Sequence, residues 1–301
     1  MRHRIFASVF VFVALTLVMA PPTQAGVSLT RVLATAKQEY SASANAGWLA
    51  YAQAPRRSGD PSAYAKPSGE RAFRINEPGT FGGSTSIEIG NPILGDVVAY
   101  QQWKGANGPD NIKLYDLVSD TWLDTPDGVN TEKSEIGPSI SGNYLVFARG
   151  PKAGNPTKVI LHDLTDDSQQ VIDEAFYAYP GDVHGDWLVW QRCERACRIM
   201  RYQISTQERS SVKTPRAGTE SYSPVIDDDG TVFFLRSGPA CGLNVRIYRA
   251  PVGGNLSTHY RFPDRVDGYL NEVTELNGFS HIYFSRYECR RDDWDIYRLP
   301  A

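Results

Sequence analysis

The sequence has little that would suggest helices or a nucleic-acid partner. Only 3 of its 301 residues are Met. No stretch beyond residue 40 keeps an apolar period of 3.6 residues, which excludes a helical bundle. Lys and Arg number 31 against 34 Asp and Glu, so the formal net charge is −3. A general nucleic-acid binder needs excess cations to displace counterions from phosphates, and we therefore expect no nucleic-acid partner.

Sequence motifs for common catalytic sites are also missing. There is no Gly-x-Ser-x-Gly elbow, no phosphate-binding loop and no His-Glu-x-x-His pair. His162, His184, His259 and His281 do not stand at metal-ligand spacings. We therefore predict no catalytic residue, no metal site and no cofactor. A Ser-His-Asp triad assembled from distant segments remains an open alternative.

Only one long apolar run is present, and it lies at the start of the chain. Two arginines precede the apolar stretch Ile5–Ala20, and Pro21 and Pro22 end it. This pattern predicts a secretory signal peptide over residues 1–25 and hence a secreted, extracellular or periplasmic protein. The alternative is an uncleaved anchor, for which the run is short. No later segment is apolar enough to span a membrane, so none is expected after cleavage.

A short phrase, Gly followed by apolar and aromatic residues, recurs about every 45 residues. The clearest copies are Gly95–Tyr100, Gly142–Phe147 and Gly185–Trp190, and weaker ones lie at 46–51, 230–235 and 280–284. Repeats of this length made of short strands indicate a β-propeller. Segments before several copies carry a Pro, which we place at the first residue of the innermost strand because Pro cannot donate to a ladder.

The six copies predict an all-β fold, a six-bladed β-propeller of four-stranded antiparallel blades in one domain, 26–301. The predicted blades are 39–89, 91–126, 136–173, 179–214, 222–262, and 269–300 plus 27–33. The last repeat stops before a fourth strand, and the strand-like residues 27–33 have no other assignment. We therefore expect 27–33 to complete the last blade and close the ring. A frayed helical segment is the alternative.

The fifth repeat carries a recognisable motif. Residues 222–234 combine a strand with Pro, an Asp-Gly turn and an apolar strand, and residues 244–255 add Ile-Tyr-Arg and a Gly-Gly turn. This motif resembles the repeat of periplasmic TolB-type propellers, and residues 293–299 match it in part. The resemblance implies a propeller with a role in binding. We expect the propeller to follow the signal peptide without the separate α/β domain of TolB proteins, so the Tol–Pal role is not carried over.

The four cysteines, Cys193, Cys197, Cys241 and Cys289, lie in or beside predicted loops on one rim of the propeller. An even number in an exported chain predicts disulfides, and four cysteines allow three pairings. We predict Cys193–Cys197 across a hairpin and Cys241–Cys289 between neighbouring blades. A zinc site is the alternative, although Cys-x3-Cys is not the usual spacing.

Two sets of polar residues on that rim are candidate site residues. The first follows the aromatic strand residue by two positions and makes the rim locally basic: Gln102, Arg149, Arg192 and Arg286. The second is a set of carboxylates near the mouth of the central channel: Glu135, Glu220 and Glu272. For both sets, ordinary solvated or paired surface charge is the alternative.

The sequence therefore favours a secreted or periplasmic, non-catalytic module that binds an envelope or extracellular protein or an anionic ligand. The alternative is an extracellular enzyme acting on a glycan, a lactone or a phosphoester at the channel mouth. Carboxylates that converge at the mouth would distinguish the second function from the first. We expect a monomer.

Overall fold

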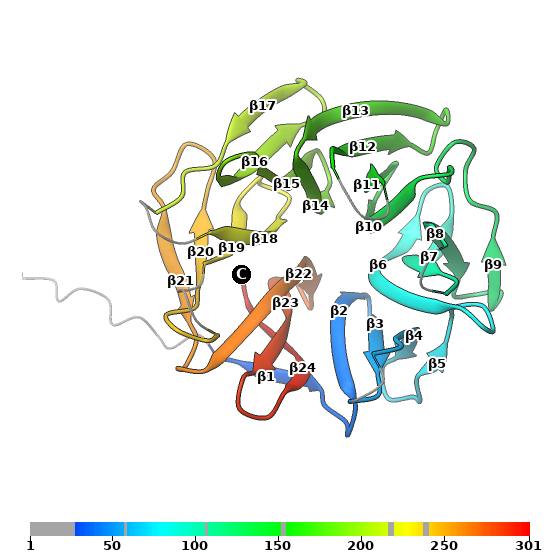
Figure 1. Cartoon of the computed structure of the whole chain (residues 1–301), viewed down its shortest axis with the longest axis horizontal. Coiled ribbons are helices and arrows are strands. Elements are labelled where there is room, and N and C mark those ends of the chain that lie inside the picture. The colour runs from blue at the N-terminus through cyan, green and yellow to red at the C-terminus, as the bar shows by residue number, and fades with distance from the viewer. Residues whose placement is uncertain (1–27, 57–58, 106–107, 152–154, 216–219, 237–240) are drawn as a thin grey trace, which may run out of the picture.

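The computed structural model describes residues 28–56, 59–105, 108–151, 155–215, 220–236 and 241–301. These residues form six four-stranded antiparallel sheets arranged as blades around a central axis (Figure 1). The predicted all-β, six-bladed propeller is thus confirmed. No helix in the described ranges is long and apolar enough to cross a membrane. The predicted signal peptide lies outside these ranges.

Each blade runs outward from an inner strand that faces the axis. Blade 1 contains β2 (Gln38–Asn45), β3 (Trp48–Ala54), β4 (Ser62–Pro67) and β5 (Phe73–Arg74); blade 2 contains β6 (Phe81–Asn91), β7 (Gly95–Trp103), β8 (Asp110–Asp116) and β9 (Thr121–Leu123); blade 3 contains β10 (Ser134–Ser141), β11 (Tyr144–Gly150), β12 (Thr157–Asp163) and β13 (Ser168–Ala175). Blade 4 contains β14 (Tyr177–His184), β15 (Trp187–Cys193), β16 (Cys197–Gln203) and β17 (Glu208–Ser211); blade 5 contains β18 (Ser221–Ile226), β19 (Val232–Arg236), β20 (Arg246–Ala250) and β21 (Ser257–Arg261); blade 6 contains β22 (Val266–Leu276), β23 (Phe279–Glu288), β24 (Asp293–Pro300) and β1 (Thr30–Leu33).

The two ends of the described chain meet in blade 6. Strand β1 pairs antiparallel with β24, with Arg31 opposite Tyr297. The Arg31 guanidinium Nη2 lies 2.6 Å from Oδ2 of Asp295, which adds an ion pair across the same strands. The predicted closure by an N-terminal strand is confirmed, and the strand begins at Thr30.

The inner strand of blade 2 is longer and lies earlier than the sequence indicated. The predicted second blade begins at residue 91, whereas β6 spans Phe81–Asn91 and residues 92–94 form the turn to β7. Asn91 Oδ1 accepts hydrogen bonds from the backbone N–H of Ile93 (3.0 Å) and Leu94 (2.9 Å). Such a side-chain bond to the following backbone favours a turn over a strand.

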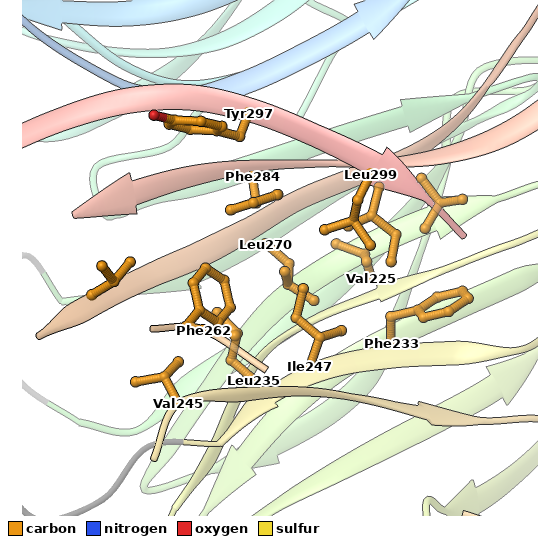
Figure 2. Close-up of a cluster of buried hydrophobic side chains, with 13 residues drawn as sticks. Val225, Phe233, Leu235, Val245, Ile247, Phe262, Leu270, Phe284, Tyr297 and Leu299 are labelled. Carbon is orange, nitrogen blue, oxygen red and sulfur yellow. The ribbon is translucent and has the colours of Figure 1, made fainter. Parts of the chain in front are cut away.

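The core lies between the blades, because the second strand of each blade is buried on both faces. Phe233, Phe234 and Leu235 in β19 are all completely buried. Figure 2 shows the cluster between blades 5 and 6, where the Phe262 ring meets Phe284 of β23 edge-on, with ring centroids 5.5 Å apart. Burying an aromatic or aliphatic side chain of this size contributes about 2 kcal/mol. The aromatic residues that recur in the sequence are therefore the ones that pack between neighbouring blades.

Both predicted disulfides are present. Cys193–Cys197 joins the ends of β15 and β16, with Cα atoms 4.0 Å apart. Cys241–Cys289 joins blade 5 to blade 6, with Cα atoms 6.2 Å apart. All four cysteines are in these two bridges, so the zinc alternative is not supported.

Candidate functional site

The inner strands share a feature that shapes the centre of the ring. Each of β2, β6, β10, β14, β18 and β22 has a β-bulge where its register against the second strand shifts. A bulge re-aims local side chains and increases twist, and bulges are common beside functional sites. Pro138, Pro180 and Pro224 lie at these bulges and not at the first strand residue, which corrects the predicted position. A bulge tolerates Pro because the ladder hydrogen bond from the backbone N–H at that position is already lost.

The bulges of all six blades surround one cavity on the axis, here called the central cavity, with a volume of about 160 Å³. Its lining combines hydroxyl, amide, tyrosine and proline side chains with short stretches of backbone, and includes Ser41, Ser84, Tyr179, Gln191, Ser223 and Tyr269. None of the described lining residues carries a charge. The cavity is therefore polar in hydrogen-bonding capacity but electrically neutral.

Contacts between blades hold the wall of this cavity in place. The backbone N–H of Ser41 donates to Ser285 Oγ (2.9 Å), and the Thr85 hydroxyl donates to the Ser41 carbonyl (2.6 Å). Between blades 5 and 6, the Ser223 hydroxyl donates to the Leu270 carbonyl (2.7 Å). Ser41 and Ser223 have φ of 54° and 51°, which is unfavourable for residues other than Gly. Such conformations persist only where the surroundings fix them, and they concentrate at binding and catalytic sites.

Aromatic rings border the central cavity. Tyr269 stacks on Trp294, with ring centroids 5.5 Å apart, and meets Tyr222 edge-on at 6.0 Å. Across the cavity, Tyr177 and Tyr179 stack with an interplanar angle of 9°. Tyr269 keeps 52% of its surface exposed despite these contacts. Burial, and then the neighbouring Tyr179 and Tyr269, raise the pKa of Tyr177 to about 12, so its hydroxyl is neutral at physiological pH.

Two further cavities continue from the central one. A cavity of about 420 Å³ lies beside Tyr40 and Trp294, and it shares Ser41 and Tyr269 with the central cavity. A cavity of about 370 Å³ lies beside Tyr177 and the Cys193–Cys197 bridge; it shares Gln191 with the central cavity. Together the three form a depression that crosses the face of the ring from blades 1 and 6 to blade 4. We call it the mouth groove.

Further along the inner strands, six equivalent positions form what we call the hub ring: Ser43, Ser86, Ser139, Asp182, Val225 and Glu272. Four of them accept a backbone N–H from the next blade, from Ile87 (2.7 Å), Ile140 (3.0 Å), Val183 (3.0 Å) and Ile226 (3.2 Å). Val225 has no acceptor in its side chain, and the N–H of Val273 instead bonds to Asp182. The hub ring thus ties neighbouring blades together around the axis.

Glu272 was predicted as a carboxylate of the channel mouth, and it lies in the hub ring. It accepts a hydrogen bond from the Ser43 hydroxyl. Burial, followed by the nearby Asp182 and Glu88, raises its pKa well above the usual value. Burial also raises the pKa of Asp182 to about 6. The two carboxyls therefore resist carrying negative charge together.

The other two predicted carboxylates lie elsewhere. Glu135 is fully buried, where Oε1 accepts from Arg149 Nε (2.9 Å) and from the Thr131 hydroxyl (2.7 Å). Glu220 borders the cavity beside Tyr177. The structure does not bring Glu135, Glu220 and Glu272 into one cluster, because each contacts a different set of residues. Within the described ranges, no group of three or more His, Cys, Asp or Glu is placed to hold a metal ion.

The predicted basic rim residues are engaged in local contacts. Arg192 pairs with Asp173 and with Glu194, at 3.1 Å from Nη2 to Oε1. Arg286 pairs with Glu288 (3.2 Å) and donates to the Tyr297 hydroxyl (2.9 Å). Together with the Arg149 pair, each predicted arginine thus has a carboxylate partner.

The fourth predicted rim residue, Gln102, is buried and accepts the backbone N–H of Glu77 (3.0 Å). Neither Gln102 nor the three arginines lie among the residues that line the central cavity. None of the residues that line the central cavity was predicted from the sequence, although the recurrent Gly-Pro, Pro-Gly and Ser-Pro pairs of the chain mark the bulges.

Comparisons with known proteins support the fold. No protein-family model and no curated protein matches the chain. Among solved structures, TolB from Acinetobacter baumannii aligns with a TM-score of 0.50 and 13% identity over 85% of this chain and 64% of its own. The chain has the architecture of a TolB-like six-bladed β-propeller. It covers less than two thirds of that TolB chain, and 50% of a matched prolyl endopeptidase.

Two enzymes align over more of their length. An oligogalacturonate lyase from Vibrio parahaemolyticus gives a TM-score of 0.53 with 12% identity, over 92% of this chain and 94% of its own. A gluconolactonase from Xanthomonas campestris gives 0.55 with 10% identity, over 90% and 89%. Identities this low establish a common fold and leave the function to be argued from the site.

Proposed function

We propose that this protein is a secreted or periplasmic, non-catalytic binding module that receives its ligand or partner in the mouth groove. The observation that carries the proposal is an aromatic cluster, formed by the exposed Tyr269 and the half-buried Trp294 and Tyr222, beside an uncharged cavity. Exposed Tyr and Trp that border a cavity provide a large contact area at a small cost in conformational entropy. The two disulfides and the predicted signal peptide support the location.

Several features favour binding over catalysis at this groove. Acid–base chemistry needs a titratable group within reach of the substrate. The described residues that line the central cavity include no carboxylate, imidazole or amine. Of the two carboxylates in the cavity beside Tyr177, Glu194 is paired with Arg192. The hub-ring carboxyls Asp182 and Glu272 are buried in hydrogen bonds between blades. We therefore assign them to the stability of the ring.

A retention experiment tests the proposed function. Wild-type protein, Tyr269→Ala and Phe279→Ala are immobilised and exposed to envelope extract and culture medium of the source organism. Residues 269 and 279 lie on the hairpin of β22 and β23 and are both exposed, but Phe279 is at the turn, away from the central cavity. We expect wild type and Phe279→Ala to retain the same material and Tyr269→Ala to lose most of it. Equal retention by all three proteins would refute the proposed function.

A further inference from the structure

The chemistry of the mouth groove also points to a class of ligand. Building on the proposed function, we infer that the groove binds a neutral, hydroxyl-rich oligosaccharide, with one sugar ring in the central cavity and further rings in the two side cavities.

The lining of the groove carries no excess of positive charge. An ionised ligand that enters a cavity loses hydration and needs an opposite charge or strong donors in return. The described lining of the central cavity has neither, and the cavity beside Tyr40 and Trp294 is also lined only by uncharged side chains. The cavity beside Tyr177 is lined by Glu194, Glu220 and Arg195, an excess of negative charge that repels an anionic ligand. The arginines nearest in sequence, Arg192 and Arg286, are paired with carboxylates. The groove therefore favours a neutral ligand over a uronate, a phosphate or an acidic peptide.

The hydrogen-bonding groups of the central cavity suit the hydroxyls of a sugar. A sugar hydroxyl both donates and accepts, so its best partners are groups that do the same. The central cavity offers the hydroxyls of Ser41, Ser84 and Tyr179 and the amides of Gln191 and Asn271. Several of these are already oriented by bonds between blades; Asn271 Oδ1, for example, accepts from Ser285 Oγ (2.9 Å). Side chains that are already oriented lose less conformational entropy when a ligand binds.

The size and arrangement of the three cavities suit a chain of linked sugar rings. The central cavity, at about 160 Å³, is smaller than the usual 300–1,000 Å³ of drug-sized sites, and it suits a single ring. The side cavities extend it in two directions, which suits a chain of linked rings. The C–H face of a pyranose is apolar, and it stacks on an aromatic ring as other apolar surfaces do. Tyr269, shared by two cavities, is placed to stack with a ring at their junction.

A peptide is the competing occupant, and the backbone of the groove disfavours it. Extended peptides gain affinity by pairing with an open strand edge. In the groove itself, the Ser41 N–H already donates to Ser285 Oγ, and the carbonyls of Ser41 and Leu270 already accept hydroxyls from neighbouring blades. A proline-rich peptide needs fewer such bonds and docks on aromatic grooves. It therefore serves as a control ligand.

Isothermal titration calorimetry with the full mature chain tests the inference. The neutral probes are hexasaccharides of α-1,4-glucose, β-1,4-glucose, β-1,4-mannose and β-1,4-N-acetylglucosamine; the comparison ligands are trigalacturonate and decaproline. We expect at least one neutral probe to bind. Tyr269→Ala should weaken that binding about tenfold, equivalent to about 1.4 kcal/mol, and Phe279→Ala should leave it unchanged. Affinity should stay constant between about 0.05 and 0.5 M salt, because no ionic contact is screened.

Three outcomes overturn the inference, and they are separable from failure of the proposed function. Stronger binding of trigalacturonate, with steep salt dependence, would show that the groove recognises charge. Binding of decaproline alone, lost in Tyr269→Ala, would replace the saccharide by a peptide and leave the proposed function intact. No binding of any neutral probe would also reject the saccharide, while the retention experiment would decide separately whether the groove binds anything.

Discussion

The buried carboxyl of Asp182 should make the stability of this propeller depend on pH in a specific window. Burial raises its pKa from 3.8 to about 6. Between these values the folded protein holds a proton that the unfolded chain has released. Stability is therefore highest at the acidic end and falls as pH rises through the window. A shift of about two pKa units at 1.36 kcal/mol each amounts to about 3 kcal/mol.

The substitution Asp182→Asn isolates this contribution. Asn keeps an oxygen that can accept the backbone N–H of Ile226 and Val273, but it has no proton to lose. Between about pH 4 and pH 7, we expect the unfolding free energy of the wild type to fall by about 3 kcal/mol relative to that of the variant. Because Asp182 also raises the pKa of Glu272, the variant should ionise Glu272 at lower pH as well.

Urea unfolding followed by tryptophan fluorescence across this pH range measures the effect. Asp264→Asn, which removes an exposed carboxylate in the segment before β22, is the matched control and should leave the pH profile of the wild type unchanged. The reasoning fails if wild-type stability does not decline across the window, or if Asp182→Asn declines as steeply as wild type.

Three further predictions concern the closure and packing of the ring. Replacing Cys241 and Cys289 by Ser should lower the unfolding free energy, measured by urea denaturation, by about 4 kcal/mol. Removing the Cys193–Cys197 bridge, whose cysteines are only four positions apart, should lower it by about 2 kcal/mol. Phe284→Ala should cost about 3–5 kcal/mol by leaving a cavity between blades 5 and 6, and a loss below 1 kcal/mol would contradict the packing described. Deleting residues 28–34 should expose the edge of β24 and promote association, so a deletion variant that stays monomeric by light scattering would argue against its role in closure.

The fold was predictable because its main stabilising contact repeats in the sequence. The second strand of each blade is buried on both faces, so it needs apolar and aromatic residues along its whole length, as Val146, Phe147 and Ala148 illustrate. That requirement leaves a periodic signal. Closure by residues 30–33 followed from the same count of strands.

Boundaries of the inner strands were harder to predict because local signals there have two meanings. Pro138 and Pro224 mark bulges inside strands, whereas the sequence suggested strand starts. Asn91 ends a strand that we expected to begin there. Telling these cases apart requires the register against the neighbouring strand, which a single sequence does not contain.

The candidate site was less predictable for a similar reason. Arg192 is neutralised by Asp173 of β13, a residue of the preceding blade, and no sequence spacing indicates that pairing. Tyr269, Trp294 and Tyr222 are read in sequence as ordinary strand residues. They form one aromatic cluster only because the ring brings blades 5 and 6 together.

Blade 6 has a consequence for the order of events in biogenesis. Arg31 and Asp295, paired in that blade, lie 264 positions apart, so β1 must wait for nearly the whole chain to emerge before its partner strand exists. Until β24 has been synthesised, β1 has no partner strand and the ring of blades cannot close.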